Sequence, residues 1–117
     1  MTHTVTDDVK SELLGFLDRK VFQPILETQT DEYNSLSERE ILDRVQRATR
    51  SEQRRYRKEY NSAEEVCVNF QRELTTENSL RMHRDLQRLG LPTLIDIRED
   101  FENLCARLGV FQKDRAA

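Results

Sequence analysis

The stretch that decides the fold runs from residue 37 to residue 65 and reads SEREILDRVQRATRSEQRRYRKEYNSAEE. It contains neither glycine nor proline, and its apolar residues recur every three or four positions. That period is typical of an amphipathic helix with one face turned to a core. The expected inward stripe consists of Ile41, Val45, Ala48, Glu52 and Tyr56.

Two capping boxes mark where helices begin in this stretch. Ser37 is followed three residues later by Glu40, and Ser62 is followed in the same way by Glu65. In such a box the serine accepts a backbone N–H of the first turn, and the glutamate reaches back to the chain before it. We therefore expect helices to begin at Ser37 and Ser62, with Asn61 between them in a left-handed conformation.

The rest of the chain is also predicted to be helical, because it has only three glycines and two prolines. The first helix is expected to begin after Thr6 and to be kinked near Pro24, whose ring clashes with the preceding turn. A fourth helix should end at Gly90. A fifth, capped by Thr93, should end at Gly109, so that the same glycine cap is used twice.

These elements predict an all-α protein, a compact bundle of four or five helices. We expect residues 1–110 to form a single domain and residues 111–117 to form a flexible tail. The first helix has an apolar surface wider than one stripe requires, which fits either a central helix or a helix that also carries a dimer or partner surface. Its apolar residues are Leu13, Leu14, Phe16, Leu17, Val21, Phe22, Ile25 and Leu26.

The composition excludes several classes of protein. Charged residues make up 35% of the 117 residues, yet 19 basic and 22 acidic side chains leave a net charge of only −3. No apolar run approaches the roughly 20 residues of a membrane span, no signal-peptide core is present, and two cysteines cannot build a disulfide scaffold. We expect a cytoplasmic protein that does not enter a membrane.

The charges are segregated along the chain. Residues 44–58 hold seven basic side chains and one acidic one, whereas residues 1–37 hold seven acidic and three basic ones. Four cations of the basic stretch have no acidic neighbour one turn before them, which makes them candidates for binding a partner or phosphate groups. They are Arg50, Arg54, Arg57 and Lys58; a secondary basic face is expected at Arg81, Arg84 and Arg88, and an acidic face at Asp96, Glu99 and Asp100.

The sequence gives little support to catalysis or to metal binding. His83 flanks an apolar stripe without the spaced ligands of a metal site. Cys67 and Cys105 fall on apolar stripes and are expected to be core thiols. Tyr56 and Tyr60 lie on or beside the stripe of the basic helix, which favours packing over base stacking. We therefore predict no catalytic residues, no metal ligands and no cofactor.

Protein interaction is the function that remains. We expect a small non-catalytic adaptor or regulatory subunit that acts through its basic and acidic helix faces, with a protein partner or a second copy in a homodimer. The leading alternative is a nucleic-acid-associated protein using the arginine-rich helix, although such proteins are usually basic overall. A third hypothesis is an enzyme or metal binder around His83.

Overall fold

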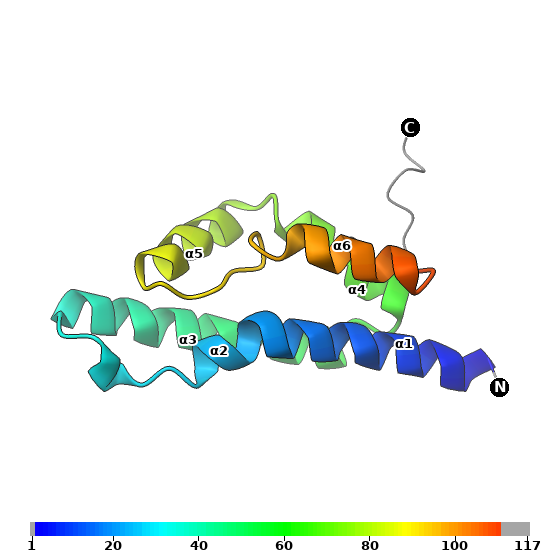
Figure 1. Cartoon of the computed structure of the whole chain (residues 1–117), viewed down its shortest axis with the longest axis horizontal. Coiled ribbons are helices and arrows are strands. Elements are labelled where there is room, and N and C mark those ends of the chain that lie inside the picture. The colour runs from blue at the N-terminus through cyan, green and yellow to red at the C-terminus, as the bar shows by residue number, and fades with distance from the viewer. Residues whose placement is uncertain (1, 111–117) are drawn as a thin grey trace.

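The computed structural model describes the chain from residue 2 to residue 110 (Figure 1), and the side chains from residue 8 onward. This part is all-α and contains no strand, which confirms the predicted fold class. The predicted tail, 111–117, lies outside the described residues. The helices are α1 (Thr2–Leu17), the π-helical turn η1 (Asp18–Phe22), α2 (Gln23–Leu26), the 3-10 turn η2 (Thr30–Glu32), α3 (Leu36–Lys58), α4 (Ala63–Glu73), α5 (Glu77–Arg88) and α6 (Arg98–Arg107).

The irregularity predicted near Pro24 lies in the turn before it. The backbone N–H of Gln23 donates to the carbonyl of Asp18, five residues back, as in a π-helix. Pro24 follows in α2, which continues η1 directly, so its missing N–H falls where the preceding turn has just widened. The wider π turn thus carries one apolar surface past the proline, with Val21, Phe22 and Ile25 all buried.

Several predicted helix starts were wrong by a few residues. Helix α1 begins at Thr2, before the expected start after Thr6. Helix α3 is capped by Ser35, whose hydroxyl accepts the N–H of Glu38 at 3.2 Å, and not by Ser37. The hydroxyl of Thr93 caps a turn over residues 94–97 by accepting the N–H of Asp96 at 3.1 Å, and α6 begins only after that turn.

The end of α3 also differs from the prediction, whereas the start of α4 agrees with it. Asn61 has no positive φ. Its N–H instead donates to the carboxylate of Glu65 at 2.8 Å, so a side-chain acceptor replaces a left-handed turn. Ser62 is the N-cap of α4, as predicted, and its hydroxyl accepts the N–H of Glu65 at 3.2 Å.

The two predicted glycine caps are confirmed. Gly90 has φ +75° and Gly109 has φ +77°. After α5, Leu91 N–H donates to Leu86 at 2.9 Å and Gly90 N–H donates to Gln87 at 3.0 Å. The two residues after Leu108 repeat this pattern on α6, so both helices end in a Schellman motif.

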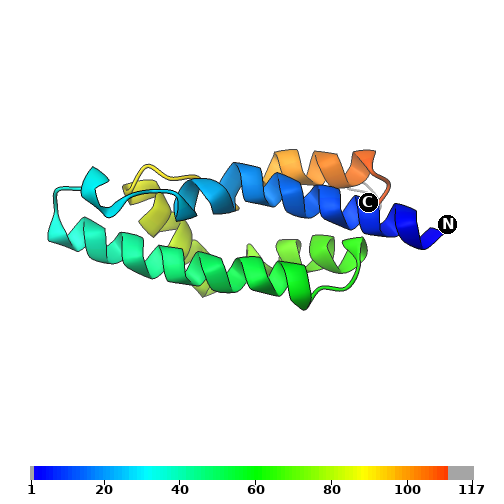
Figure 2. The same ribbon diagram turned by 90° about the horizontal axis from the view of Figure 1, so that it is seen from below.

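Helix α1 is the centre of the bundle. It packs against α4 and α6, while η1 and α2 continue it along α3. Figure 2 shows α1 lying between α3 and α6. This position accounts for the width of its apolar surface, because Leu13 and Leu17 are fully buried within the same chain. No described helix is long and apolar enough to cross a membrane.

The glycines offer a test of this backbone. We expect Gly90→Ala to lower the free energy of unfolding by about 1 kcal/mol, because an L side chain is strained at positive φ. Gly15→Ala is the control: Gly15 lies inside α1, where an added Cβ meets only the end of the Arg19 side chain at 3.4 Å. It should be neutral or stabilise by up to about 1 kcal/mol. Urea denaturation measures both, and equal effects of the two changes would contradict the left-handed cap.

Candidate functional site

The basic stretch of α3, residues 44–58, carries two kinds of basic side chain. The first kind is bound to carboxylates of the same chain, three of them from other helical segments. These ion pairs are Arg44–Asp85 at 3.0 Å, Arg47–Asp43 at 2.8 Å, Arg55–Glu73 at 3.6 Å and Arg57–Asp18 at 3.0 Å. Arg57 has no acidic neighbour nearby in the sequence, because its ion-pair partner, Asp18, lies 39 residues earlier in the chain.

The second kind is a row that we call the basic ridge: Arg50, Arg54 and Lys58. All three side chains are exposed, and none has a carboxylate within ion-pair distance among the described residues. Their spacing of four residues places them one above another along the outer side of the helix, over about 12 Å of its length. The ridge is thus a line of unneutralised positive charge on a rigid helix.

The secondary basic face on α5 is less uniform. Arg84 is exposed, Arg81 lines a groove described below, and Arg88 donates to the Ser37 hydroxyl at 3.3 Å. The predicted acidic residues Asp96, Glu99 and Asp100 are exposed in and just before α6. Helices α6 and α3 lie on opposite edges of the fold (Figure 2), and within the described part none of these acidic residues forms an ion pair with the basic ridge.

A groove of about 560 Å³ runs between α3, the end of α4 and α5. That volume lies in the range of ligand pockets. Arg44, Arg55 and Arg81 line it with positive charge, and Glu73 and Asp85 line it with negative charge. Its apolar surface comes from Val45, Ala48 and Met82. The groove and the ridge lie on adjacent sides of α3, about a third of a turn apart at 100° per residue.

Two of the residues that line the groove are glutamates that meet, Glu52 of α3 and Glu73 of α4. The carboxyl of Glu52 is hydrogen-bonded to that of Glu73, and their side chains are only 13% and 18% exposed. Burial, and then the hydrogen bond and the negative charge of Glu73, raise the pKa of Glu52 well above its ordinary value. Burial thus favours the protonated form of Glu52, in which its O–H donates the hydrogen bond to the Glu73 carboxylate.

Glu73 is the charged member of this pair. It accepts from the Tyr56 hydroxyl at 3.3 Å and the Tyr60 hydroxyl at 3.0 Å, and the Arg55 guanidinium lies 3.6 Å away. Burial and the Glu73 carboxylate raise the pKa of both tyrosines, so both remain protonated donors. Tyr56 is fully buried, which confirms that it packs in the core.

Sequence reasoning missed this carboxyl pair, although one signal was visible. Glu52 is the only acidic residue between Arg44 and Lys58, and it falls on the apolar stripe rather than on the charged face. An acid at an inward position must be paired or protonated. Its partner Glu73 lies 21 residues later in another helix, and nothing local pointed to it.

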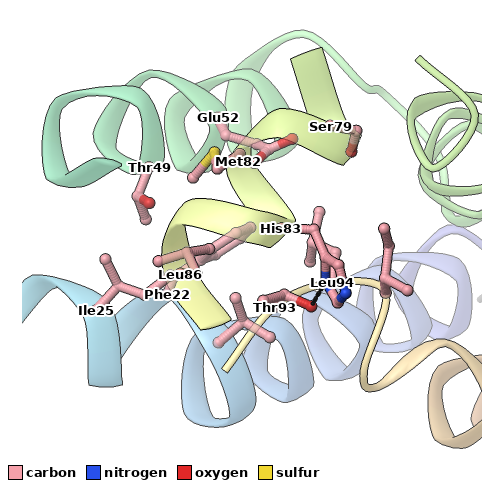
Figure 3. A pocket seen from close by; sticks show the side chains of 12 residues that line it. Phe22, Ile25, Thr49, Glu52, Ser79, Met82, His83, Leu86, Thr93 and Leu94 are labelled. Carbon is pink, nitrogen blue, oxygen red and sulfur yellow. Dashed lines mark hydrogen bonds between the residues drawn. The ribbon is translucent and has the colours of Figure 1, made fainter. Parts of the chain in front are cut away.

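Next to the pair, a small cavity of about 20 Å³ lies between η1, α2, α3, α5 and the segment before α6 (Figure 3). His83 Nδ1 lies 2.6 Å from the Thr93 hydroxyl, which links α5 to this segment. Thr49 Oγ1 is the only buried side-chain oxygen or nitrogen of the described residues without a hydrogen-bond partner. No group of three or more His, Cys, Asp or Glu side chains in the described part is placed to hold a metal ion.

Comparison of the chain with protein-family models, with curated proteins and with solved structures finds no match.

The raised pKa of Glu52 predicts that the free energy of unfolding depends on pH. A raised folded pKa means that the contribution of Glu52 is complete below its unfolded pKa and is lost as pH rises through the folded pKa. Glu52→Gln keeps a neutral donor at every pH. Between about pH 5 and about pH 8 it should gain on the order of 1 kcal/mol in unfolding free energy relative to the wild type.

Glu73→Gln is the matched control for that experiment. It removes the negative acceptor of two tyrosines and the ion-pair partner of Arg55, so it should destabilise the protein. Urea denaturation across this pH range measures both variants. A Glu52→Gln variant that tracks the wild type at every pH would show that Glu52 is ionised in the folded protein.

The two buried threonines give a second matched test. Thr49→Val removes a hydroxyl without a partner, so we expect a neutral effect or a gain of about 1 kcal/mol. Thr93→Val removes the hydroxyl that accepts from Asp96 and bonds to His83, and should cost about 1–3 kcal/mol. Thermal unfolding followed by circular dichroism checks both values, and a large loss with Thr49→Val would reveal a partner for that hydroxyl.

Proposed function

We propose that this protein is a non-catalytic interaction module that binds an acidic segment of a partner protein along the basic ridge of α3. One observation carries the proposal: Arg44, Arg47, Arg55 and Arg57 are each neutralised within the chain, whereas the three ridge cations are not. A row of like charges on one helix is compensated well by a row of carboxylates at a similar spacing.

The surroundings of the ridge favour a protein segment over nucleic acid. The neighbouring groove offers apolar side chains together with both signs of charge, as a peptide with mixed side chains requires. The whole chain has a net charge of −3, and three cations neutralise few phosphates compared with the 6–10 or so contacts of typical DNA-binding proteins.

Of the two protein partners expected from the sequence, a different protein is favoured over a second copy. A two-fold dimer formed through the ridge would place like charges against each other. If the ridge of one molecule paired with the acidic residues near α6 of a second, opposite edges of the two molecules would be joined. Each molecule would keep one unpaired edge, so the assembly would grow as an open filament and would not close as a dimer.

The binding test uses two fluorescent probes, a polyglutamate peptide and a mixed-sequence DNA duplex, titrated at low salt and followed by anisotropy. We expect the peptide to bind, with an affinity that falls as salt is raised. Arg54→Glu with Lys58→Glu should weaken peptide binding roughly tenfold or more. The matched control is Arg72→Glu with Arg107→Glu, which changes the net charge equally through exposed residues of α4 and α6.

The outcomes separate the hypotheses. Equal weakening by both double variants would mean that only the total charge matters, and would overturn the ridge as the site. Tighter binding of the duplex than of the peptide would make nucleic acid the ligand. Light scattering of the unbound protein completes the test, because a mass twice that of one chain would make a second copy the partner.

A further inference from the structure

The two cysteines of the chain come together between α4 and α6. Their sulfur atoms, Cys67 Sγ and Cys105 Sγ, are 2.6 Å apart, and both residues are buried, with exposures of 3% and 1%. That separation is only about half an ångström longer than a disulfide bond. Both cysteines are free. The expectation of buried core thiols is therefore confirmed, but their pairing was invisible to the sequence.

We propose that Cys67 and Cys105 are a redox modification site, at which a low-molecular-weight disulfide such as glutathione disulfide converts the thiol pair into an intramolecular disulfide. The pairing is unambiguous, because the chain contains no third cysteine. The bond would join α4 directly to α6, two helices that both pack on α1.

The chemistry proceeds by two thiol–disulfide exchanges. Cys67 loses its proton and attacks one glutathione sulfur, so a Cys67–glutathione bond forms and one glutathione leaves, taking up a proton. Cys105 then loses its proton and attacks Cys67 Sγ, which releases the second glutathione as a thiol. Two protein thiols are oxidised by two electrons in total, and one glutathione disulfide is reduced to two thiols.

Burial of both sulfur atoms limits the access of an oxidant to the pair. The hydrogen bond to Cys67 and burial also raise the pKa of the Cys105 thiol, which slows its attack as a thiolate. The oxidant reaches the buried sulfurs when α6, a helix of ten residues close to the end of the described chain, opens locally. Exchange in the folded protein should therefore be slow and faster in mild urea.

The test incubates the full chain in buffer containing glutathione disulfide, both folded and during refolding from urea. We expect the intact mass to fall by about 2 Da, because disulfide formation removes two hydrogen atoms. Peptide mapping without reductant should join the Cys67 peptide to the Cys105 peptide, and a dithiol should restore the original mass. The oxidised protein should unfold about 10 °C higher than the reduced protein.

Two control variants, Cys67→Ala and Cys105→Ala, should show no such difference in unfolding temperature and should instead gain glutathione. Three results would overturn the proposal. One is a wild-type protein that accumulates as a glutathione adduct. Another is a wild-type protein that forms disulfide-linked dimers. The third is a mass that stays unchanged even after refolding with the oxidant. Because the wild-type chain carries the main readout, the test stands even if a variant fails to fold.

Discussion

Tyr56 connects three parts of the bundle. Its ring is fully buried on α3, its centroid lies 6.0 Å from that of Phe22 in η1, and its hydroxyl donates to Glu73 of α4. Tyr60 packs edge-on against the same ring at 5.0 Å and donates to the same carboxylate. An aromatic ring with a polar tip is well suited to such a junction, because its body fills the core while its hydroxyl requires an acceptor. Glu73 provides that acceptor, and its carboxylate therefore lies in a half-buried position beside the tyrosine.

Glu73 and two further carboxylates then determine which cations of α3 are neutralised. Glu73 holds Arg55 on the inner side of the helix, Asp85 holds Arg44, and Asp18 holds Arg57. Each of these carboxylates comes from a segment packed against α3. Cations that face a neighbouring segment are thus neutralised by the fold, whereas those on the outer side have no segment opposite them. The ridge is a consequence of the packing as much as of the local sequence.

Rules that involve only residues close together in the sequence predicted the parts of the fold that such residues specify. Gly90 and Gly109 end their helices as expected, because a left-handed cap is specified by a few adjacent positions. The same rules placed the cap of α3 at Ser37 instead of Ser35, because both serines precede a helical stripe and the choice depends on where the chain enters the bundle. The start of α6 failed for a related reason, since Thr93 is engaged by Asp96 and His83 and caps only a turn.

The features that matter for function required tertiary structure. The sequence separations of Glu52 from Glu73, Arg57 from Asp18, and Cys67 from Cys105 run from 21 to 39 residues. No helical period brings such residues together, so a single sequence without the fold cannot reveal them. The sequence did show where a charged residue falls at a position that faces the core. Glu52 in an apolar stripe is the clearest case, because the fold places its carboxyl beside that of Glu73 with only 13% of the side chain exposed.

The free energies of ion pairing and of side-chain ordering indicate what kind of segment the basic ridge can bind. An exposed ion pair contributes roughly 0.2–1 kcal/mol, while fixing a long side chain at an interface costs roughly 0.5–1.5 kcal/mol. The free energy gained from three ion pairs on the ridge is therefore about equal to the cost of fixing the three side chains. Charge alone then gives specificity and fast association, but little affinity. The remaining affinity must come from apolar burial, which the adjoining groove offers through Ala48 and Met82. An acidic helix with an apolar side chain directed into this groove satisfies both requirements, so it should bind more tightly than a purely acidic segment such as polyglutamate.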